Sequence, residues 1–211
     1  MSNAAVVQLS PLGKRELTKQ QNRQAILDAA REAFADLGYE AATVRDIIRR
    51  SGLSVGAFYN YYRSKEEVHE ALADDAAWRF RPILAAQYEA AADLSGYIRG
   101  ASGAYFTCRA AEYETWRAGR PAGERTGPHL RAETPEIRAV FDQVRASIAD
   151  ALDRSQGPRV DADYLAAACI AIAREVGERM LERRPIDVPG AVEFAVRMIE
   201  GGLPALPRLD P

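Results

Sequence analysis

The side chains best suited to binding chemistry lie close together between residues 43 and 65. Tyr59 and Tyr61 carry hydroxyls that can donate to phosphate oxygens, and Lys65 adds a positive charge at the start of an expected helix, where free N–H groups also favour phosphate. Three residues beside the tyrosines have almost no bulk: Val55, Gly56 and Ala57. Such a face lets a backbone approach a groove floor and touch thymine methyls, so the set indicates a nucleic-acid interface.

Cap residues define the elements that must position this face. Thr43 stands three residues before Asp46, which is a helix-start pattern, and Gly52 suits the helix end. Ser54 then caps a short helix over residues 55–61. Two short helices joined by a tight turn with glycine predict a helix-turn-helix.

Two further capping boxes are expected to open the flanking helices. Thr18 with Gln21 predicts the start of a first helix, and Ser64 with Glu67 predicts the start of a fourth. The 3.6-residue period places one apolar set in the core of these helices: Phe34, Ile47, Leu53, Phe58 and Tyr62. The sequence thus predicts a disordered arm over 1–17 and a three-helix domain over 18–63.

Four segments carry a resemblance to a known family: Thr43–Ile47, Gly52–Ser54, Phe58–Tyr62 and Ser64–Glu67. Together they resemble the N-terminal domain of the TetR family of transcriptional regulators, over roughly residues 20–72 and with no gap in the spacing. The resemblance implies contacts with double-stranded operator DNA from nine residues: Thr43, Val44, Arg45, Val55, Gly56, Ala57, Tyr59, Tyr61 and Lys65.

The chain departs from the family pattern in two places. Ile48 and Ser51 stand where the family usually has alanines, so the packing of the second helix on the third is expected to shift. The face over 55–57 has no hydrogen-bonding side chain, which leaves Arg45 as the candidate for direct base reading.

Charge is distributed unevenly along the chain. Residues 1–65 carry ten Lys/Arg against six Asp/Glu, a net of +4, whereas 66–211 carry 18 against 24, a net of −6. A basic N-terminal part on an acidic remainder fits DNA contact through the N-terminal domain alone, although +4 is also compatible with ordinary scatter.

Several other classes of protein are disfavoured. No uncharged apolar run approaches the roughly 20 residues of a membrane span, and no secretory signal precedes the first helix. Cys108 and Cys169 lack CxxC spacing and fit reduced thiols in a cytoplasm, and His69 and His129 sit in no metal-ligand pattern. Because the common catalytic signatures are absent as well, we expect a cytoplasmic protein that is not an enzyme and needs no metal or cofactor.

The remainder, 64–211, predicts a larger helical domain for effector binding and dimerisation, so the whole chain is expected to be all-α. A helix from Ser64 should kink or restart at Pro82, and a separate short helix is expected over 112–118. Glycines and prolines predict a surface loop over 119–133, and Thr134-Pro135 predicts a clean helix start.

The last two helices offer more apolar surface than one subunit needs. The stretch 164–173 carries no charge on any face. In the final helix Val196 and Ile199 line one side, while Phe194 and Met198 lie on another. A small domain could bury both sides within itself. The family resemblance instead implies a homodimer through a four-helix bundle, which also fits a palindromic site.

Aromatic residues concentrate in the middle of the chain, where the family carries its ligand cavity: Tyr88, Tyr97, Tyr105, Phe106, Tyr113 and Trp116. Such walls suit a small hydrophobic effector, although each residue could equally belong to a core. The sequence therefore predicts a ligand-responsive regulator, most often a repressor in this family. The alternative is a helical interaction protein that keeps the fold without recognising specific DNA.

Overall fold

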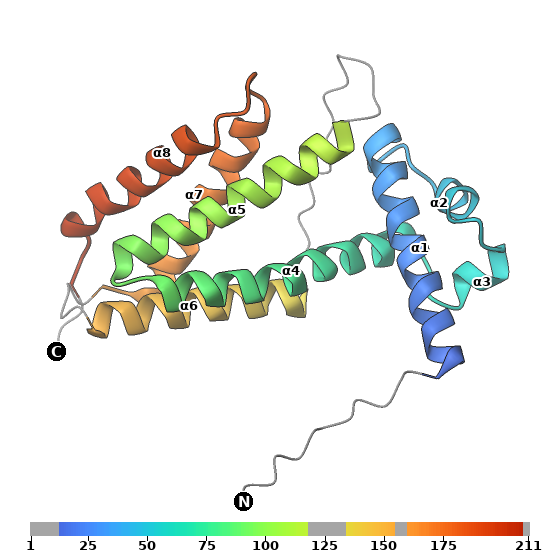
Figure 1. Cartoon of the computed structure of the whole chain (residues 1–211), viewed down its shortest axis with the longest axis horizontal. Helices are drawn as coiled ribbons and strands as arrows, with labels where there is room; N and C mark the ends of the chain where they lie inside the picture. The colour runs from blue at the N-terminus through green and yellow to red at the C-terminus, as the bar shows by residue number, and fades with distance from the viewer. Residues whose placement is uncertain (1–12, 118–133, 155–159, 209–211) are drawn as a thin grey trace, which may run out of the picture. The chain divides into compact units, whose positions relative to one another are not determined.

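The computed structural model describes residues 13–117, 134–154 and 160–208, and within these ranges the chain is helical with no strand (Figure 1). The elements are α1 (Lys14–Leu37), α2 (Val44–Ser51), α3 (Val55–Tyr59), α4 (Lys65–Ala90), α5 (Leu94–Arg117), α6 (Pro135–Arg154), α7 (Ala162–Leu181), α8 (Val188–Gly202) and the 3₁₀ helix η1 (Leu203–Ala205). The predicted all-α class is confirmed. The loop expected over 119–133 lies outside the described residues, as does most of the arm expected over 1–17.

Contacts divide the chain into two compact units. The N-terminal unit is Met1–His69 and the C-terminal unit is Glu70–Pro211, so the dividing point falls inside α4. The three-helix domain expected over 18–63 lies within the N-terminal unit, together with the first residues of α4.

In the N-terminal unit, α1 supplies the surface on which α2 and α3 pack. Ile26, Phe34, Ile47 and Phe58 are all at most 2% exposed, and Tyr62 is 7% exposed. These are the side chains that the 3.6-residue period assigns to the core, except that Leu53 is only half-buried. Burying aromatic and branched side chains from three helices fixes the position of the short α3, which could not persist alone.

The predicted start of α1 is wrong. The helix begins at Lys14, behind Gly13, and Thr18 therefore lies inside it and caps nothing. Strong helix-forming residues precede Thr18, and Glu16 in the first turn interacts favourably with the helix dipole. The local preference for a helix outweighs the capping pattern at this position.

The separate helix expected at 112–118 is wrong, because α5 continues from Leu94 to Arg117. A restart at Pro82 does not occur either, since α4 continues through Pro82 to Ala90. A proline removes one backbone bond, a loss that water can compensate where the neighbouring turn is exposed, as it is at Trp78. In α5 the glycine at 100 is held by close contact, because a Cβ there would lie 2.6 Å from the Gln87 side-chain oxygen.

The C-terminal unit is built from long helices around two apolar clusters. One cluster joins α5, α6, α7 and α8 around Tyr97 and Ile148, and the other lies around Phe106 and Met180. The predicted start of α6 is confirmed, since the Thr134 hydroxyl accepts the Ile137 N–H. Asp161 likewise accepts two N–H groups at the start of α7. None of the helices in the described ranges is long and apolar enough to cross a membrane.

The final helix is two-sided, as its sequence predicts. Ala195 and Val196 are fully buried, whereas Phe194 is 59% and Met198 56% exposed. On α7, Tyr164 is 79% exposed. This outer surface, which we call the α7–α8 apolar face, consists of Tyr164, Phe194 and Met198 with the exposed alanines Ala167, Ala168 and Ala171.

Candidate nucleic-acid interface

The start of α2 is fixed by a reciprocal capping box. The Thr43 side chain accepts the Asp46 N–H at 3.3 Å, and the Asp46 carboxylate accepts the Thr43 N–H at 3.1 Å. The Thr43 hydroxyl also donates to Asp46 at 2.6 Å. These bonds from Thr43 hold the pKa of Asp46 below its ordinary value. The Thr43 hydroxyl donates its proton to Asp46, so it cannot donate to a phosphate in this arrangement. The role of Thr43 in this structure is to fix the start of α2.

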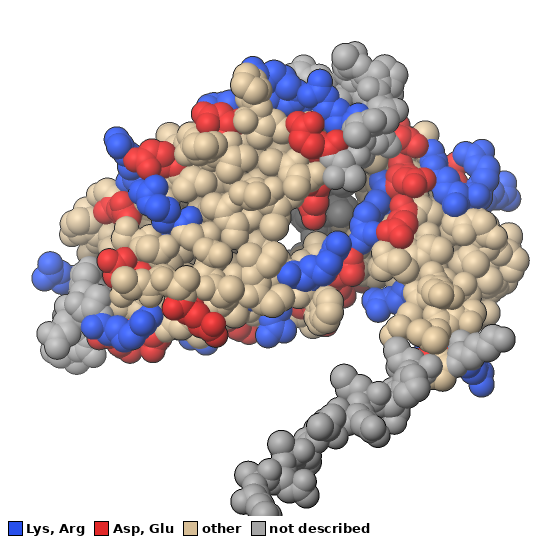
Figure 2. Space-filling view, in the orientation of Figure 1, with Lys and Arg blue, Asp and Glu red and all other residues tan. Residues whose placement is uncertain are grey.

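The arginines of α2 differ in their partners. Arg49 pairs with Asp46 at 3.2 Å, and Arg50 pairs with Asp36 at 2.7 Å. Arg45 is exposed, and no ion pair to it is found within the described ranges. Basic groups gather over α2 in Figure 2, whereas the surface around α3 carries little charge. Arg45 is thus the arginine of α2 best placed to reach an external ligand.

A rigid turn joins α2 to α3. Gly52 adopts the left-handed conformation with φ of +68°. The Ser51 hydroxyl donates to the Ile48 carbonyl at 2.9 Å and accepts the Leu53 N–H at 3.3 Å. The serine that departs from the family pattern therefore contributes two bonds to the turn, and Ile48 beside it is half-buried.

The outer face of α3 is open. Ser54 caps the helix through the Ala57 N–H, Val55 is 59% exposed and Tyr59 is 53% exposed. A Cβ added at Gly56 would meet no atom within 4 Å. Ala57 is half-buried and lies at the margin of this face. The predicted close-approach surface is therefore present around Val55, Gly56 and Tyr59.

The two tyrosines after α3 are tied back to α1. The Asn22 amide donates to the Tyr61 hydroxyl at 3.3 Å, and the Arg23 guanidinium donates to the Tyr62 hydroxyl at 3.1 Å. Tyr61 is half-buried and Tyr62 is buried, so Tyr61 alone of this pair remains accessible. Its oxygen accepts from Asn22, which leaves its own proton directed elsewhere.

Lys65 is bound within the protein. Its ammonium donates to the carbonyls of Tyr39 at 2.8 Å and of Glu40 and Ala42 at 3.2 Å each, and it lies 4.5 Å from the centre of the Tyr39 ring. An ammonium has three N–H donors, so none is left for the phosphate contact predicted for Lys65. In this structure Lys65 fixes the segment that leads into α2.

The predicted capping box at the start of α4 is half formed. Ser64 accepts the Glu67 N–H at 3.3 Å, but Glu67 accepts the N–H of Arg63 at 2.7 Å and not that of Ser64. Glu66 takes part as well, and hydrogen bonds, from its own backbone first and then from Ser64, hold its pKa below the ordinary value.

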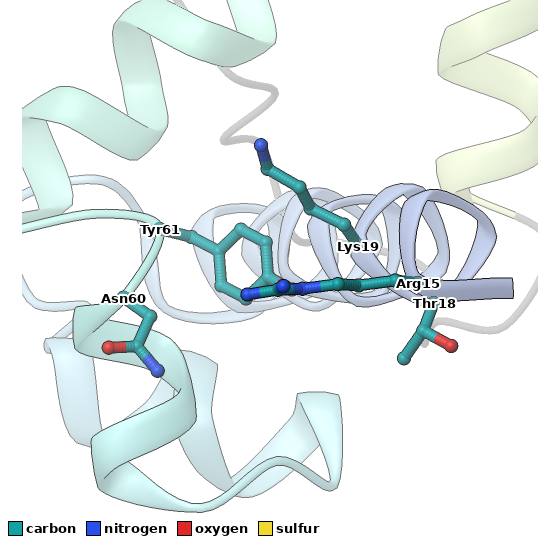
Figure 3. A pocket seen from close by; sticks show the side chains of 5 residues that line it. All are labelled: Arg15, Thr18, Lys19, Asn60 and Tyr61. Atoms are coloured by element: carbon teal, nitrogen blue, oxygen red, sulfur yellow. The ribbon is translucent and has the colours of Figure 1, made fainter. Parts of the chain in front are cut away.

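One part of the N-terminal unit's surface was missed by the sequence analysis. A hollow of about 680 Å³ is lined by Arg15, Thr18, Lys19, Asn60 and Tyr61 (Figure 3). Only Tyr61 was predicted as a contact. Both basic residues were counted in the net charge, but Arg15 was assigned to the arm over 1–17, and nothing in the sequence placed Lys19 beside Tyr61.

The aromatic residues predicted to line an effector site fall into different surroundings. Tyr97 is 2% exposed in the cluster around Ile148 and packs edge-on against Tyr88. Tyr105 belongs to the cluster around Phe106, where it packs at a tilt against that ring, and it packs edge-on against Phe80 of the first cluster. Tyr88 donates to Asp150, and Tyr113 lies under the Arg184 guanidinium. The side chain of Trp116 is outside the described set, and the other five residues are divided between the two clusters.

The Tyr97 hydroxyl is unusual among these groups. It is buried and makes no hydrogen bond of ordinary geometry to a described residue. Burial raises its pKa, and the nearby Ser147 opposes that shift only in part. A buried donor without a partner costs free energy unless something else accepts from it.

Comparison with known proteins gives this arrangement its context. The family model for bacterial regulatory proteins of the tetR family matches residues 26–72. The repressor AcnR of Corynebacterium glutamicum is 29% identical over 136 residues, which cover 64% of this chain and 68% of AcnR. The transcriptional activator FasR of Mycolicibacterium smegmatis is 26% identical over 193 residues, covering 90% of this chain and 87% of FasR.

A solved structure shares the fold of nearly the whole chain. The regulator FadR of Bacillus subtilis, in complex with stearoyl-CoA, superposes with a TM-score of 0.67 at 15% identity, over 85% of this chain and 98% of FadR. The curated relatives are transcriptional regulators, so the alternative of an interaction protein that no longer recognises DNA is not favoured.

Proposed function

Because the chain belongs to the TetR family of bacterial regulatory proteins, we propose that it is a repressor that binds a palindromic operator as a homodimer and is released by a small hydrophobic effector. The observation that carries the proposal is the outer face of α3. A Cβ at Gly56 would meet no atom within 4 Å, and Val55 and Tyr59 on the same face are exposed. The Ser54 cap fixes the start of the helix, and the hydrogen bond from Asn22 ties the segment after it to α1. A rigid helix face of this kind fits a major groove.

The roles of individual residues follow from their partners. Arg45 is proposed to contact a base edge, because Arg49 and Arg50 are paired to carboxylates. Tyr59 and Tyr61 are proposed to contact phosphates through their hydroxyls. Lys65 and Thr43 act indirectly, since their donors fix the start of α2. Val44 and Ala57, which the resemblance also implies as contacts, remain proposals.

A gel-shift assay with DNA from upstream of the chain's own gene tests the proposal. Wild-type protein should shift this fragment and not a scrambled one of equal length. Gly56→Phe should abolish the shift, because the ring would hold α3 away from the groove floor. Circular dichroism should show that Gly56→Phe keeps the helical content of wild type, since a Cβ at Gly56 meets no atom within 4 Å. Equal binding by wild type and Gly56→Phe would contradict the proposal.

The proposed base contact of Arg45 can be distinguished from nonspecific electrostatic attraction to DNA. Arg45→Ala should lower the preference for operator over scrambled DNA by roughly 1–3 kcal/mol. Arg49→Ala removes the same charge from the same helix but from an ion pair, and should change the preference much less. If both substitutions weakened all duplexes equally, neither arginine would be a base reader.

The dimer is proposed to form through the α7–α8 apolar face. Exposed apolar side chains on two helices favour a partner that buries them. A dimer with a twofold axis through this face would also present one α3 helix to each half of a palindrome. Sedimentation should show a dimer at micromolar concentration for wild type and a monomer for Phe194→Glu. Arg197→Glu, on the same helix, should remain a dimer. A monomeric wild type would contradict both the dimer and the palindrome.

The effector is proposed to bind in the C-terminal unit beside Tyr97, whose buried hydroxyl could donate to it. Stearoyl-CoA is the first probe, because the FadR neighbour is described with that ligand. A tenfold loss of operator affinity on adding the probe corresponds to about 1.4 kcal/mol of coupling. No change with acyl-CoA esters of several lengths would rule out this class. We also propose a cytoplasmic location, because a DNA-binding regulator must reach its operator and because free thiols such as Cys169 persist there.

A further inference from the structure

The hollow in the N-terminal unit is built by one stripe of α1 facing the end of α3. Thr18 and Lys19 each lie three or four residues from both Arg15 and Asn22, so the four residues lie on one side of α1. Asn22 holds the Tyr61 hydroxyl at 3.3 Å, which brings this stripe against the segment that follows α3. Figure 3 shows Arg15 and Lys19 extending from α1 beside Tyr61, with Asn60 on the other wall.

The chemistry of the lining favours an anion. Two cations, Arg15 and Lys19, line the hollow, and no carboxylate does. Tyr61 accepts from Asn22 and so keeps its own proton for another acceptor, and the amide of Asn60 is exposed. Guanidinium, ammonium, phenol and amide donors on one open surface match an oxygen-rich group with several lone pairs.

The position of the hollow identifies the source of the anion. It adjoins the last residues of α3, which we have proposed to lie in the major groove. A helix in that groove has a sugar–phosphate strand beside each of its ends, since the groove is about 12 Å wide. We propose that this hollow binds a backbone phosphodiester of the operator, with Arg15 and Lys19 supplying charge and Tyr61 a hydrogen bond. This inference rests on the proposed function and adds α1 to the DNA contacts.

The test uses the full chain and the operator fragment, with affinity measured over a series of salt concentrations. The double variant Arg15→Gln, Lys19→Gln should bind more weakly and reduce the slope of log K against log[salt] by about 1 for each N-terminal unit, or about 2 for a dimer. The ratio of operator to scrambled DNA affinity should stay the same within about twofold, because a phosphate carries no base information.

A matched control removes a cation from the same helix outside the hollow. Arg31→Gln lies farther along α1, where Arg31 pairs with Asp28 at 2.5 Å, and should leave the salt slope within experimental error. Tyr61→Phe keeps the ring and removes the hydroxyl, and should weaken binding with little change in slope. Circular dichroism should confirm that every variant keeps the helical content of wild type.

Neutral methylphosphonate linkages, placed one at a time along the operator, locate the contact. One position in each half-site should weaken wild type severalfold while having no further effect on the double variant. An unchanged salt slope in the double variant, an equal change in Arg31→Gln, or no such position would each overturn the inference. Failure of the wild type to prefer operator over scrambled DNA would instead overturn the proposed function.

Discussion

The two units of this chain treat their polar side chains differently. Helices begin at side-chain caps in both units, but in the N-terminal unit a single ammonium on Lys65 also satisfies three carbonyls before α2. In the C-terminal unit, long helices pack through apolar clusters, and the buried Tyr97 hydroxyl makes no hydrogen bond of ordinary geometry to a described residue.

The difference matches what each unit has to do. A surface that must fit a fixed groove benefits from local bonds that allow a single arrangement. An interior that must accept a ligand and pass the change on needs packing that can rearrange at low cost.

The largest expected effect comes from opening the core of the N-terminal unit. Phe58→Ala removes the fully buried ring of α3, which packs against Tyr59 and Tyr62, and should lower the free energy of unfolding by about 3–5 kcal/mol. Tyr59→Ala, one residue away and 53% exposed, should cost no more than about 0.5 kcal/mol. Urea unfolding followed by circular dichroism measures both. Equal losses would mean that α3 is not held by its inner face.

A smaller effect is expected at the turn between α2 and α3. Gly52→Ala forces a Cβ into the left-handed region and should cost about 1–2 kcal/mol. Gly56→Ala is the control, because that glycine has an ordinary φ and open surroundings. It should stabilise the protein by up to about 1 kcal/mol, since alanine is the better helix former. A neutral Gly52→Ala would show that the turn is not as rigid as its bonds indicate.

The starts of helices could be predicted from the sequence more often than the places where helices continue. The starts of α2, α3 and α6 follow from caps that act within three residues of sequence, and all were predicted correctly. That α4 continues through Pro82 could not be read from the sequence, because a proline usually ends or kinks a helix, whereas the residues around Pro82 are exposed in the structure. The beginning of α1 was wrong because a capping pattern at Thr18 competes with helix-forming residues before it.

The residues of the candidate site also differ in whether the sequence could place them. The exposed residues of α3 follow from helical period, so Gly56 and Tyr59 were placed correctly on the open face. Lys65 could not be placed, because its three acceptors belong to a loop 23 to 26 residues earlier in the chain. Arg15 and Lys19 were missed for the same reason, since only the folded α1 brings them beside Tyr61.

Removing the cap of α2 should have a moderate effect that depends on pH. Thr43→Ala should cost about 1 kcal/mol near neutral pH, because the Asp46 N–H loses its acceptor. The Asp46 pKa is depressed in the folded protein, chiefly by the bond from the Thr43 side chain. Its stabilising contribution is therefore present above the ordinary value of 3.8 and is lost as pH falls through the lower folded value.

The variant should consequently approach wild type in acid. Urea midpoints near neutral pH and at about pH 3 would measure this, and the difference between the two proteins should shrink at the lower pH. Ser54→Ala, which removes a cap without an acidic partner, should lose stability equally at both values. A Thr43→Ala deficit that stayed constant with pH would mean that Asp46 does not act through Thr43.

The smallest change in stability is expected at Tyr97. Tyr97→Phe removes a buried hydroxyl that makes no hydrogen bond of ordinary geometry to a described residue, so the free energy of unfolding should stay the same or rise by up to about 1 kcal/mol. Tyr88→Phe, which removes a hydroxyl bonded to Asp150, should instead cost up to about 1 kcal/mol. If the Tyr97 hydroxyl serves the effector, Tyr97→Phe should also bind operator normally but need more effector for release, a change that calorimetry would resolve. A marked loss of stability in Tyr97→Phe would show that the hydroxyl serves the core, and would remove the contrast between the two units at this position.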